Sequence, residues 1–203
     1  MARFLVTHSL LSSWLYCIKE NSYEDATTEA DHIAEFLRVL RREPSETTEA
    51  MAKGNAFEQL VEDIANGDAD TDHEWYAAAK KIADKIAGGV TQVKVSKTIV
   101  VNGLSVLLHG RLDWLKAGTI YDVKYTGKYE NGKFFDSTQH PMYFELIPEA
   151  DVFEYLVSNG TYTWTETYRR DETQSILLVI SNFFNWLTDM GFMDIYQQYW
   201  MAK

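Results

Sequence analysis

Residues 104–124, LSVLLHGRLDWLKAGTIYDVK, decide the fold. Two runs of alternating apolar and polar residues lie on either side of a turn at residues 116–118, and a period of two is typical of strands. Residues 93–101 alternate in the same way and end at an Asn-Gly pair at 102–103, the strongest short hairpin signal. The sequence therefore predicts an antiparallel three-stranded meander.

Helical periodicity surrounds this meander. Apolar stripes predict four helices before residue 89 and a long helix near the C-terminus, and a second Asn-Gly pair predicts another hairpin. The expected fold is α/β, with a mixed central sheet (the meander plus further strands) flanked by helices, in one domain over residues 1–203. The expected elements are helices at 9–18 (capped by Ser9), 33–40, 47–66 and 75–86, a loop at 127–137, a helix at 137–147, strands at 151–158 and 161–168, and a helix capped by Asp171 that ends at Gly191.

Composition excludes several classes of protein. Of the 203 residues, 46% are hydrophobic and only 3 are proline, so the chain has enough apolar material to offset the entropy lost on ordering. The single cysteine, Cys17, excludes a disulfide framework, a four-cysteine zinc site and a cysteine-held iron–sulfur cluster. No targeting signal or membrane span is visible, so we expect a soluble, intracellular protein.

The charge is unevenly distributed. The net charge is −11, which taken alone argues against binding an anionic polymer. Residues 90–135, however, carry 7 basic and 3 acidic residues and lie between two acidic flanks. This basic segment indicates either a local anion-binding surface or a sheet whose edges are rich in lysine, which also discourages aggregation.

Charged residues share one face of the meander. Because residues i and i+2 of a strand point the same way, His109, Arg111 and Asp113 lie on one face, and so do Asp122 and Lys124 on the next strand. The turn brings Asp113 and Asp122 close to cross-strand positions, where two carboxylates repel each other unless a cation lies between them. Oxygen ligands of this kind suit Mg²⁺ or Mn²⁺, and the Lys124 ammonium can reach the same point.

The helix at 47–66 supplies a third carboxylate. Glu58 lies at the border of the apolar arc of this helix, and Gly54, one turn earlier, leaves room for another element.

These residues carry a resemblance to a known family. The segments Gly54–Glu58 on a helix, Gly110–Asp113 on a strand and Asp122–Lys124 on the next strand resemble the three motifs of the PD-(D/E)XK nuclease superfamily. Gln139–Tyr143 is similar to the Q-x-x-x-Y motif of its RecB-like exonuclease branch. The resemblance covers about residues 47–158 and implies a restriction-endonuclease-like core.

The resemblance also implies roles for individual residues. It makes Lys124 catalytic and Glu58 a ligand of a metal or of water. The sequence departs from the family pattern at Glu58, where many RecB-like members have histidine. It also lacks the iron–sulfur cysteines of some members. The metal ligands it implies are Asp113, Asp122 and the Val123 carbonyl, and the expected DNA contacts are Gln139, Tyr143, Arg111, Lys128 and Lys133.

The expected function is therefore a metal-dependent deoxyribonuclease that uses one or two Mg²⁺ or Mn²⁺ ions and no iron–sulfur cluster. An exonuclease acting on linear duplex or single-stranded ends is favoured over an endonuclease. The setting implied is recombination, repair or phage DNA processing in the cytoplasm of a bacterial or phage-infected cell, with a recombination or single-strand-binding protein as a further partner. The oligomeric state stays open.

Plainer interpretations stay open beside these. A catalytically inactive acidic protein, a DNA mimic or interaction protein, could keep the same fold. Asp113 and Asp122 could be surface acids that flank a turn, and Lys124 could merely pair with Asp122. Arg111 could balance nearby carboxylates and not touch phosphate. Glu58 could be a solvated helix residue, Gln139 a partner of a helix N-cap, Tyr143 a core aromatic, and His109 a strand-packing residue. The aromatic residues near the C-terminus have helical spacing, which favours core packing over base stacking.

Overall fold

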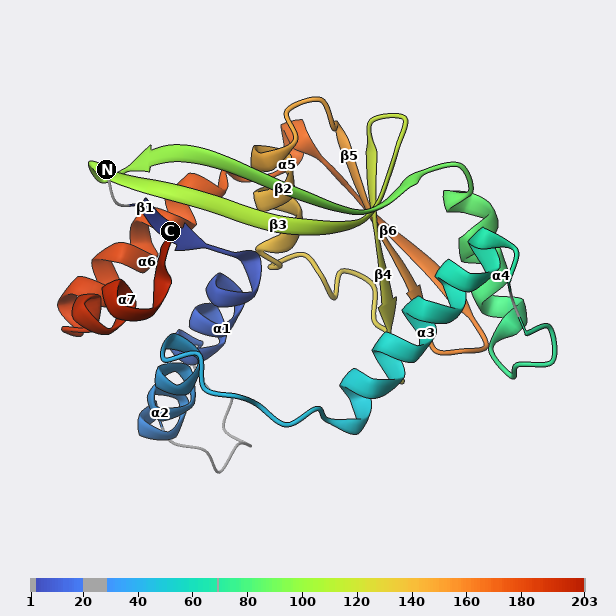
Figure 1. Ribbon diagram of the computed structural model, residues 1–203, viewed down its shortest axis with the longest axis horizontal. Helices are drawn as coiled ribbons and strands as arrows, with labels where there is room; N and C mark the ends of the chain where they lie inside the picture. The colour runs from blue at the N-terminus through green and yellow to red at the C-terminus, as the bar shows by residue number, and fades with distance from the viewer. Residues whose placement is uncertain (1–2, 20–28, 69, 203) are drawn as a thin grey trace.

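A computed structural model describes residues 3–19, 29–68 and 70–202. It has a mixed sheet of seven strands flanked by seven helices within these residues, so the expected α/β class is confirmed (Figure 1). The elements are β1 (Arg3–Val6), α1 (His8–Ile18), α2 (Glu29–Leu40), α3 (Glu49–Asn66), α4 (Tyr76–Ile86), β2 (Val90–Val101), β3 (Leu104–Lys116), β4 (Thr119–Tyr125), α5 (Gln139–Leu146), β5 (Val152–Ser158), β6 (Thr163–Arg169), α6 (Ile176–Asp189), α7 (Met193–Trp200) and β7 (Met201–Ala202).

Strand β3 organises the sheet. The main order is β6-β5-β4-β3-β1-β7, and β2 pairs with β3 as well. Strand β2 lies antiparallel along almost the whole of β3, from Val90↔Leu115 to Val101↔Leu104. The opposite edge of β3 is therefore shared by β1, which is parallel to it, and by β4, which is antiparallel. Figure 1 shows the long β2–β3 ribbon crossing the shorter strands β4, β5 and β6.

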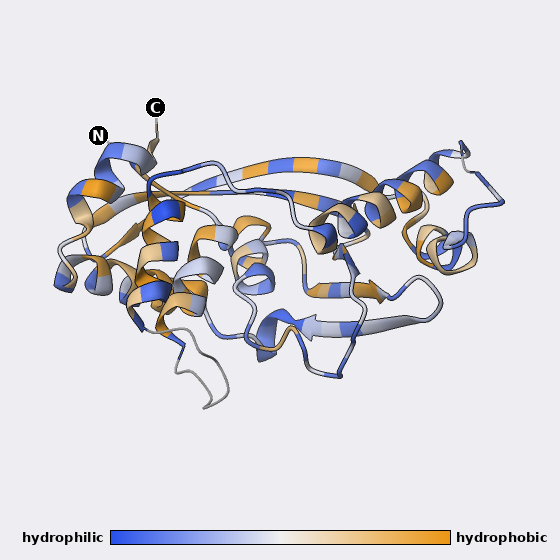
Figure 2. Ribbon diagram, turned by 90° about the horizontal axis from the view of Figure 1, so that it is seen from below, coloured by the Kyte–Doolittle hydropathy of each residue, from blue (hydrophilic) through white to orange (hydrophobic). Residues whose placement is uncertain are grey.

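Two apolar cores lie on the sheet. One is formed with α1, α2, α5, α6 and α7, and the other lies under α3 and α4. In Figure 1, α1, α2, α6 and α7 lie toward one end of the ribbon, α3 and α4 lie toward the other, and α5 lies along its middle. In Figure 2 the β2–β3 ribbon shows the alternating bands that the sequence predicts. The C-terminal aromatics pack in the first core, as expected: Phe183, Phe184, Tyr196 and Trp200 are buried, whereas Tyr199 is 38% exposed.

The structure corrects the expected helix caps. Helix α1 begins one residue before the expected Ser9, because the Thr7 side chain accepts a hydrogen bond from the Leu10 amide. Helix α6 is capped by Ser175, whereas the expected cap Asp171 lies in a short 3₁₀ turn, Arg170–Glu172. The sequence analysis also missed β1 and β7, the two strands that extend the sheet beyond β3.

Among the residues that the structure describes, no helix combines the length and the apolar character that crossing a membrane requires.

Candidate active site

The site lies in a gap along one edge of β3. On that edge β1 pairs with residues 106–108 and β4 pairs with residues 114–116. Residues 109–113 between them have no described strand on this edge, although β2 pairs with residues 109–112 along the other edge. A hollow of about 350 Å³ opens at this gap. Its walls are formed by the segment after β1, the middle of β3 and the end of β4, together with one side chain from α3 and two from α5. The lining residues are Thr7, His8, Ser9, Glu58, His109, Gly110, Arg111, Asp113, Asp122, Val123, Lys124, Gln139 and Tyr143.

The two aspartates meet where β3 and β4 separate. The last pair of the ladder on this side is Trp114↔Tyr121, so Asp113 and Asp122 occupy the next position. Beyond this point the Asp113 carboxylate accepts a hydrogen bond from the Val123 amide at 3.2 Å. Since the N–H and C=O of one strand residue point to the same side, the Val123 carbonyl also faces the gap. The structure thus brings Asp113 and Asp122 to adjacent positions on the two strands, where the strand pattern and the turn place them.

The surroundings of Asp113 disfavour its charged form. Burial raises the pKa of the Asp113 carboxyl well above its usual range, and the nearby Asp122 and Glu58 carboxylates raise it further. The Val123 amide and the Lys124 ammonium offset only part of this effect. A cation placed against Asp113 and Asp122 would relieve both the desolvation and the repulsion.

Lys124 already supplies one positive charge. Its ammonium lies 2.7 Å from Oδ2 of Asp122, as an ion pair that is buried on the aspartate side. Burial lowers the pKa of Lys124, but the Asp122 carboxylate and then Asp113 and Glu58 raise it, and the net shift is upward. Lys124 is therefore protonated at neutral pH and can donate hydrogen bonds into the hollow.

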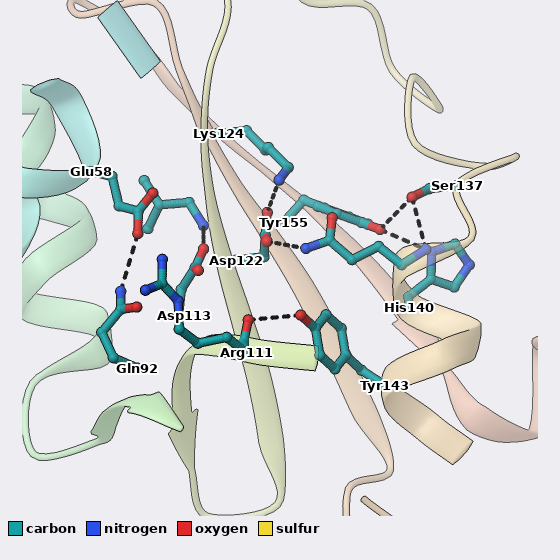
Figure 3. A network of polar contacts seen from close by, with 12 residues as sticks. Glu58, Gln92, Arg111, Asp113, Asp122, Lys124, Ser137, His140, Tyr143 and Tyr155 are labelled. Carbon is teal, nitrogen blue, oxygen red and sulfur yellow. Dashed lines mark hydrogen bonds and ion pairs between the residues drawn. The ribbon is translucent and has the colours of Figure 1, made fainter. Parts of the chain in front are cut away.

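Helix α5 holds both sides of the gap. Gln139 donates from its side-chain amide to Oδ1 of Asp122 on β4, and the Tyr143 hydroxyl donates to the Arg111 carbonyl on β3 at 2.7 Å (Figure 3). Both side chains are almost fully buried, at 7% and 3% exposure. The expected contact of these two residues with DNA stays a prediction. In the structure they position the Asp122 carboxylate on β4 and the backbone of β3 at Arg111.

Gly110 allows α5 to approach β3 this closely. A Cβ atom at this position would lie 2.6 Å from Cε1 of Tyr143, well inside van der Waals contact. The glycine in the Gly110–Asp113 motif therefore has a packing reason: only a residue without a side chain leaves room for the Tyr143 ring.

Glu58 lines the hollow from α3, on the side away from α5. It is half-buried on α3, and Gln92 on β2 donates to its Oε1 at 3.2 Å. Burial raises the pKa of Glu58, whereas the Gln92 hydrogen bond lowers it. Gln92 itself has a φ of 52°, a strained backbone for a residue with a side chain. Figure 3 shows Glu58 and Gln92 on the opposite side of Asp113 from Asp122 and Tyr143.

Sequence reasoning missed two residues of the site, His8 and Gln92. His8 is the first residue of α1, two residues after the end of β1, and its ring packs near Tyr143 at 5.9 Å between centroids. Burial lowers the pKa of His8 to about 4, so a neutral imidazole faces the hollow at neutral pH. No pattern in the sequence marks either residue, because His8 depends on β1 and Gln92 on the pairing of β2.

The remaining expected residues lie around this centre. Arg111 is exposed on β3 and lines the hollow. His109 contacts Ser96 across the strand pair through Nδ1 at 2.9 Å, as a strand-packing residue would. Lys128 and Lys133 lie in the loop after β4: Lys128 pairs with Glu130 at 2.8 Å, and Lys133 donates to the Lys128 carbonyl.

The donor set fits a hard divalent cation. Asp113, Asp122 and the Val123 carbonyl offer oxygen ligands from two adjacent strands. Burial first, and then the neighbouring carboxylates, raise the pKa of Asp113, and a cation beside it would offset both effects. Across the residues described, no cluster of three or more histidine, cysteine or acidic side chains already has the spacing of a metal site. Glu58, held by Gln92, is thus a candidate third ligand or water ligand that faces the hollow from a distance.

Comparison with known proteins supports the fold. No family model and no curated protein sequence matches the chain. The structure is similar to the crystal structure of SSO0001, with a TM-score of 0.55 at 12% sequence identity, over 93% of this chain and 76% of that chain. At this identity the likeness concerns the fold alone.

Proposed function

We propose that this chain is a divalent-metal-dependent nuclease that hydrolyses phosphodiester bonds in DNA, with exonuclease action favoured over endonuclease action. The observation that carries the proposal is the juxtaposition of Asp113, Asp122 and Lys124 in a hollow beside the edge of β3 that lies between β1 and β4. A buried and a half-buried carboxylate beside one lysine suit metal-assisted phosphoryl chemistry. The order of the four motifs along the chain agrees with this proposal.

In this proposal the chain's own residues divide the work. Asp113, Asp122 and the Val123 carbonyl would hold Mg²⁺ or Mn²⁺, which supplies a Lewis acid and lowers the pKa of bound water. Lys124 donates hydrogen bonds to the attacking water or to the phosphoryl oxygens as negative charge develops on them. Gln139 fixes the Asp122 carboxylate through one oxygen and leaves the other to Lys124. Attack of water on phosphorus breaks the bond to one ester oxygen, and that oxygen leaves with a proton.

The experiment that tests the proposal compares DNA with and without ends. End-labelled linear DNA and closed circular DNA are incubated with the purified protein and Mg²⁺ or Mn²⁺, with EDTA as the control. Degradation of linear DNA only identifies an exonuclease, whereas cutting of circles identifies an endonuclease. Absence of cleavage with either metal, by a folded protein, would refute the proposal.

The net charge of −11 favours one alternative, an acidic interaction protein that keeps the fold without catalysis. Metal dependence separates the two. A protein that binds Mn²⁺ gains roughly 2.7 kcal/mol in its free energy of unfolding when the Mn²⁺ concentration is about 100 times the Kd. An inactive protein with no metal site shows no such increase.

A further inference from the structure

A row of aligned residues links the site to the edge of the sheet. Lys124 on β4 pairs with Val157 on β5, and Val157 pairs with Trp164 on β6. Residues aligned in this way point to the same face, so Trp164 lies on the face of Lys124. Two strand spacings separate them, which is about 10 Å between their backbones.

Aromatic rings gather at the end of this row. Tyr129, in the loop after β4, stacks on Trp164 with 4.8 Å between ring centroids and 28° between planes. Tyr162, directly before β6, has its ring centroid 6.2 Å from that of Trp164 and is 64% exposed. We call Tyr129, Trp164 and Tyr162 the aromatic strip. Tyr129 and Trp164 are partly buried against the first core, so core packing explains part of their position. It does not explain the exposed ring of Tyr162.

The loop that carries Tyr129 is anchored. The Glu166 carboxylate on β6 is buried and accepts hydrogen bonds from the Lys133 amide at 3.1 Å and the Phe134 amide at 3.3 Å, and from the Tyr168 hydroxyl at 2.7 Å. Phe134 in turn stacks on Tyr155 at 4.4 Å. The strip is therefore preorganised, which lowers the entropy cost of binding a ligand on it.

Positive charge lies along the same path. The Lys128 side chain is 86% exposed and pairs with exposed Glu130, and a phosphate can replace such a partner. Lys133 donates to Oγ1 of Thr126, beside the end of β4. Lysines interleaved with stacked aromatics match the backbone and the bases of a single strand, respectively.

We propose that the aromatic strip is a base-stacking surface for single-stranded nucleic acid, which it leads toward Lys124. This inference rests on the proposed nuclease function for the direction of the strand, but binding can be tested without cleavage. A distance of about 10 Å accommodates about three stacked nucleotides at 3.4 Å each. Paired bases in a duplex hide their faces from the strip, so the substrate class is a single-stranded end or tail.

The test measures affinity for a fluorescein-labelled (dT)₁₂ and for a fully paired DNA hairpin, in Ca²⁺ and with oligonucleotide integrity checked on gels. The variants are Trp164→Ala, Trp164→Phe and Tyr162→Ala. Tyr199→Ala, on α7 at the far end of the molecule, is the matched control. Loss of one stacked base weakens binding by about 5- to 150-fold, so we expect Trp164→Ala to weaken (dT)₁₂ binding about tenfold or more.

The expected pattern is specific to stacking. Trp164→Phe should restore most of the affinity, Tyr162→Ala should weaken (dT)₁₂ binding several-fold, and hairpin binding should change less than twofold. Unchanged (dT)₁₂ affinity in both alanine variants, or wild-type protein that binds the hairpin as well as (dT)₁₂, would overturn the inference. If Trp164→Ala does not fold, exposed Tyr162 decides the question. Strip-dependent (dT)₁₂ binding without any cleavage in Mg²⁺ or Mn²⁺ supports the strip and refutes only the nuclease proposal.

Discussion

Replacing Asp113 with asparagine tests whether the charge of this carboxylate destabilises the metal-free protein while it serves metal binding and cleavage. The side-chain oxygen of the introduced asparagine can still accept the Val123 amide, so the geometry is kept and only the charge is removed. Two carboxylates about 5 Å apart across adjacent strands repel by about 3 kcal/mol at an effective dielectric constant of 20. Lys124 offsets a part of this repulsion, so we expect Asp113→Asn to stabilise the metal-free protein by about 1–2 kcal/mol at neutral pH, or roughly 2–8 °C in Tm.

The gain should depend on pH in a defined direction. The folded-state pKa of Asp113 is raised, so the wild-type protein keeps the stability of the protonated form below the unfolded pKa of about 3.9 and loses it as the pH rises through the folded pKa. Asparagine does not titrate. The stability difference between variant and wild type should therefore be near zero below about pH 4 and grow toward neutral pH.

Divalent metal should reverse the order of the two proteins. In Mn²⁺ at about 100 times the wild-type Kd, the wild type gains roughly 2.7 kcal/mol and overtakes the variant, which also loses cleavage. Thermal melts in EDTA and in Mn²⁺, from pH 4 to 8, measure all three effects. Asp84→Asn, an exposed acid on α4, is the matched control and should change Tm by less than about 2 °C in either buffer. A variant that melts below wild type in EDTA at neutral pH, or equal gains in Mn²⁺, would refute the reasoning.

Three further predictions concern the surroundings of Asp113. Lys124→Met should keep most of the metal affinity, measured by calorimetry, while cleavage falls by about 10²- to 10⁴-fold; a parallel fall in affinity and activity would mean that Lys124 is structural. Gly110→Ala should destabilise the protein by about 1–3 kcal/mol in urea unfolding, because the new methyl overlaps the Tyr143 ring; wild-type stability would show that α5 can move away freely. Neutralising Lys128 and Lys133 together should weaken DNA binding and reduce the salt slope by about one unit for each phosphate that the protein no longer neutralises, and an unchanged slope would place the DNA path elsewhere.

The meander and most helices could be predicted because their signals are local. Alternation and turn residues predict a second strand from Leu104, and β3 begins there; they predict a third strand from Thr119, and β4 begins there. Strand β1 carries no such signal. Its four residues are too few to show an alternating pattern. They form a strand because they pair with an edge of β3, about a hundred residues later in the chain.

The same distinction applies to the site. Asp113, Asp122 and Lys124 could be placed together because a tight turn fixes their register, and that register is local. The gap between β1 and β4 could not be foreseen, since it depends on where two strands stop pairing on one edge. His8 and Gln92 depend on that gap and on the β2 pairing, so their roles appear only in three dimensions.

The spacing of Gln139 and Tyr143 has a geometric explanation in this gap. The two residues lie one helical turn apart, which is about 6 Å along the axis, slightly more than the spacing of about 4.8 Å between adjacent strands. One turn of α5 can therefore contact β4 through Asp122 and β3 through the Arg111 carbonyl, at the place where the two strands no longer pair with each other. The helix replaces the missing ladder, and it does so with side chains whose bonds set the carboxylate and the backbone in place. A glutamine and a tyrosine four residues apart thus connect one helix to both strands across the gap beside which the hollow lies.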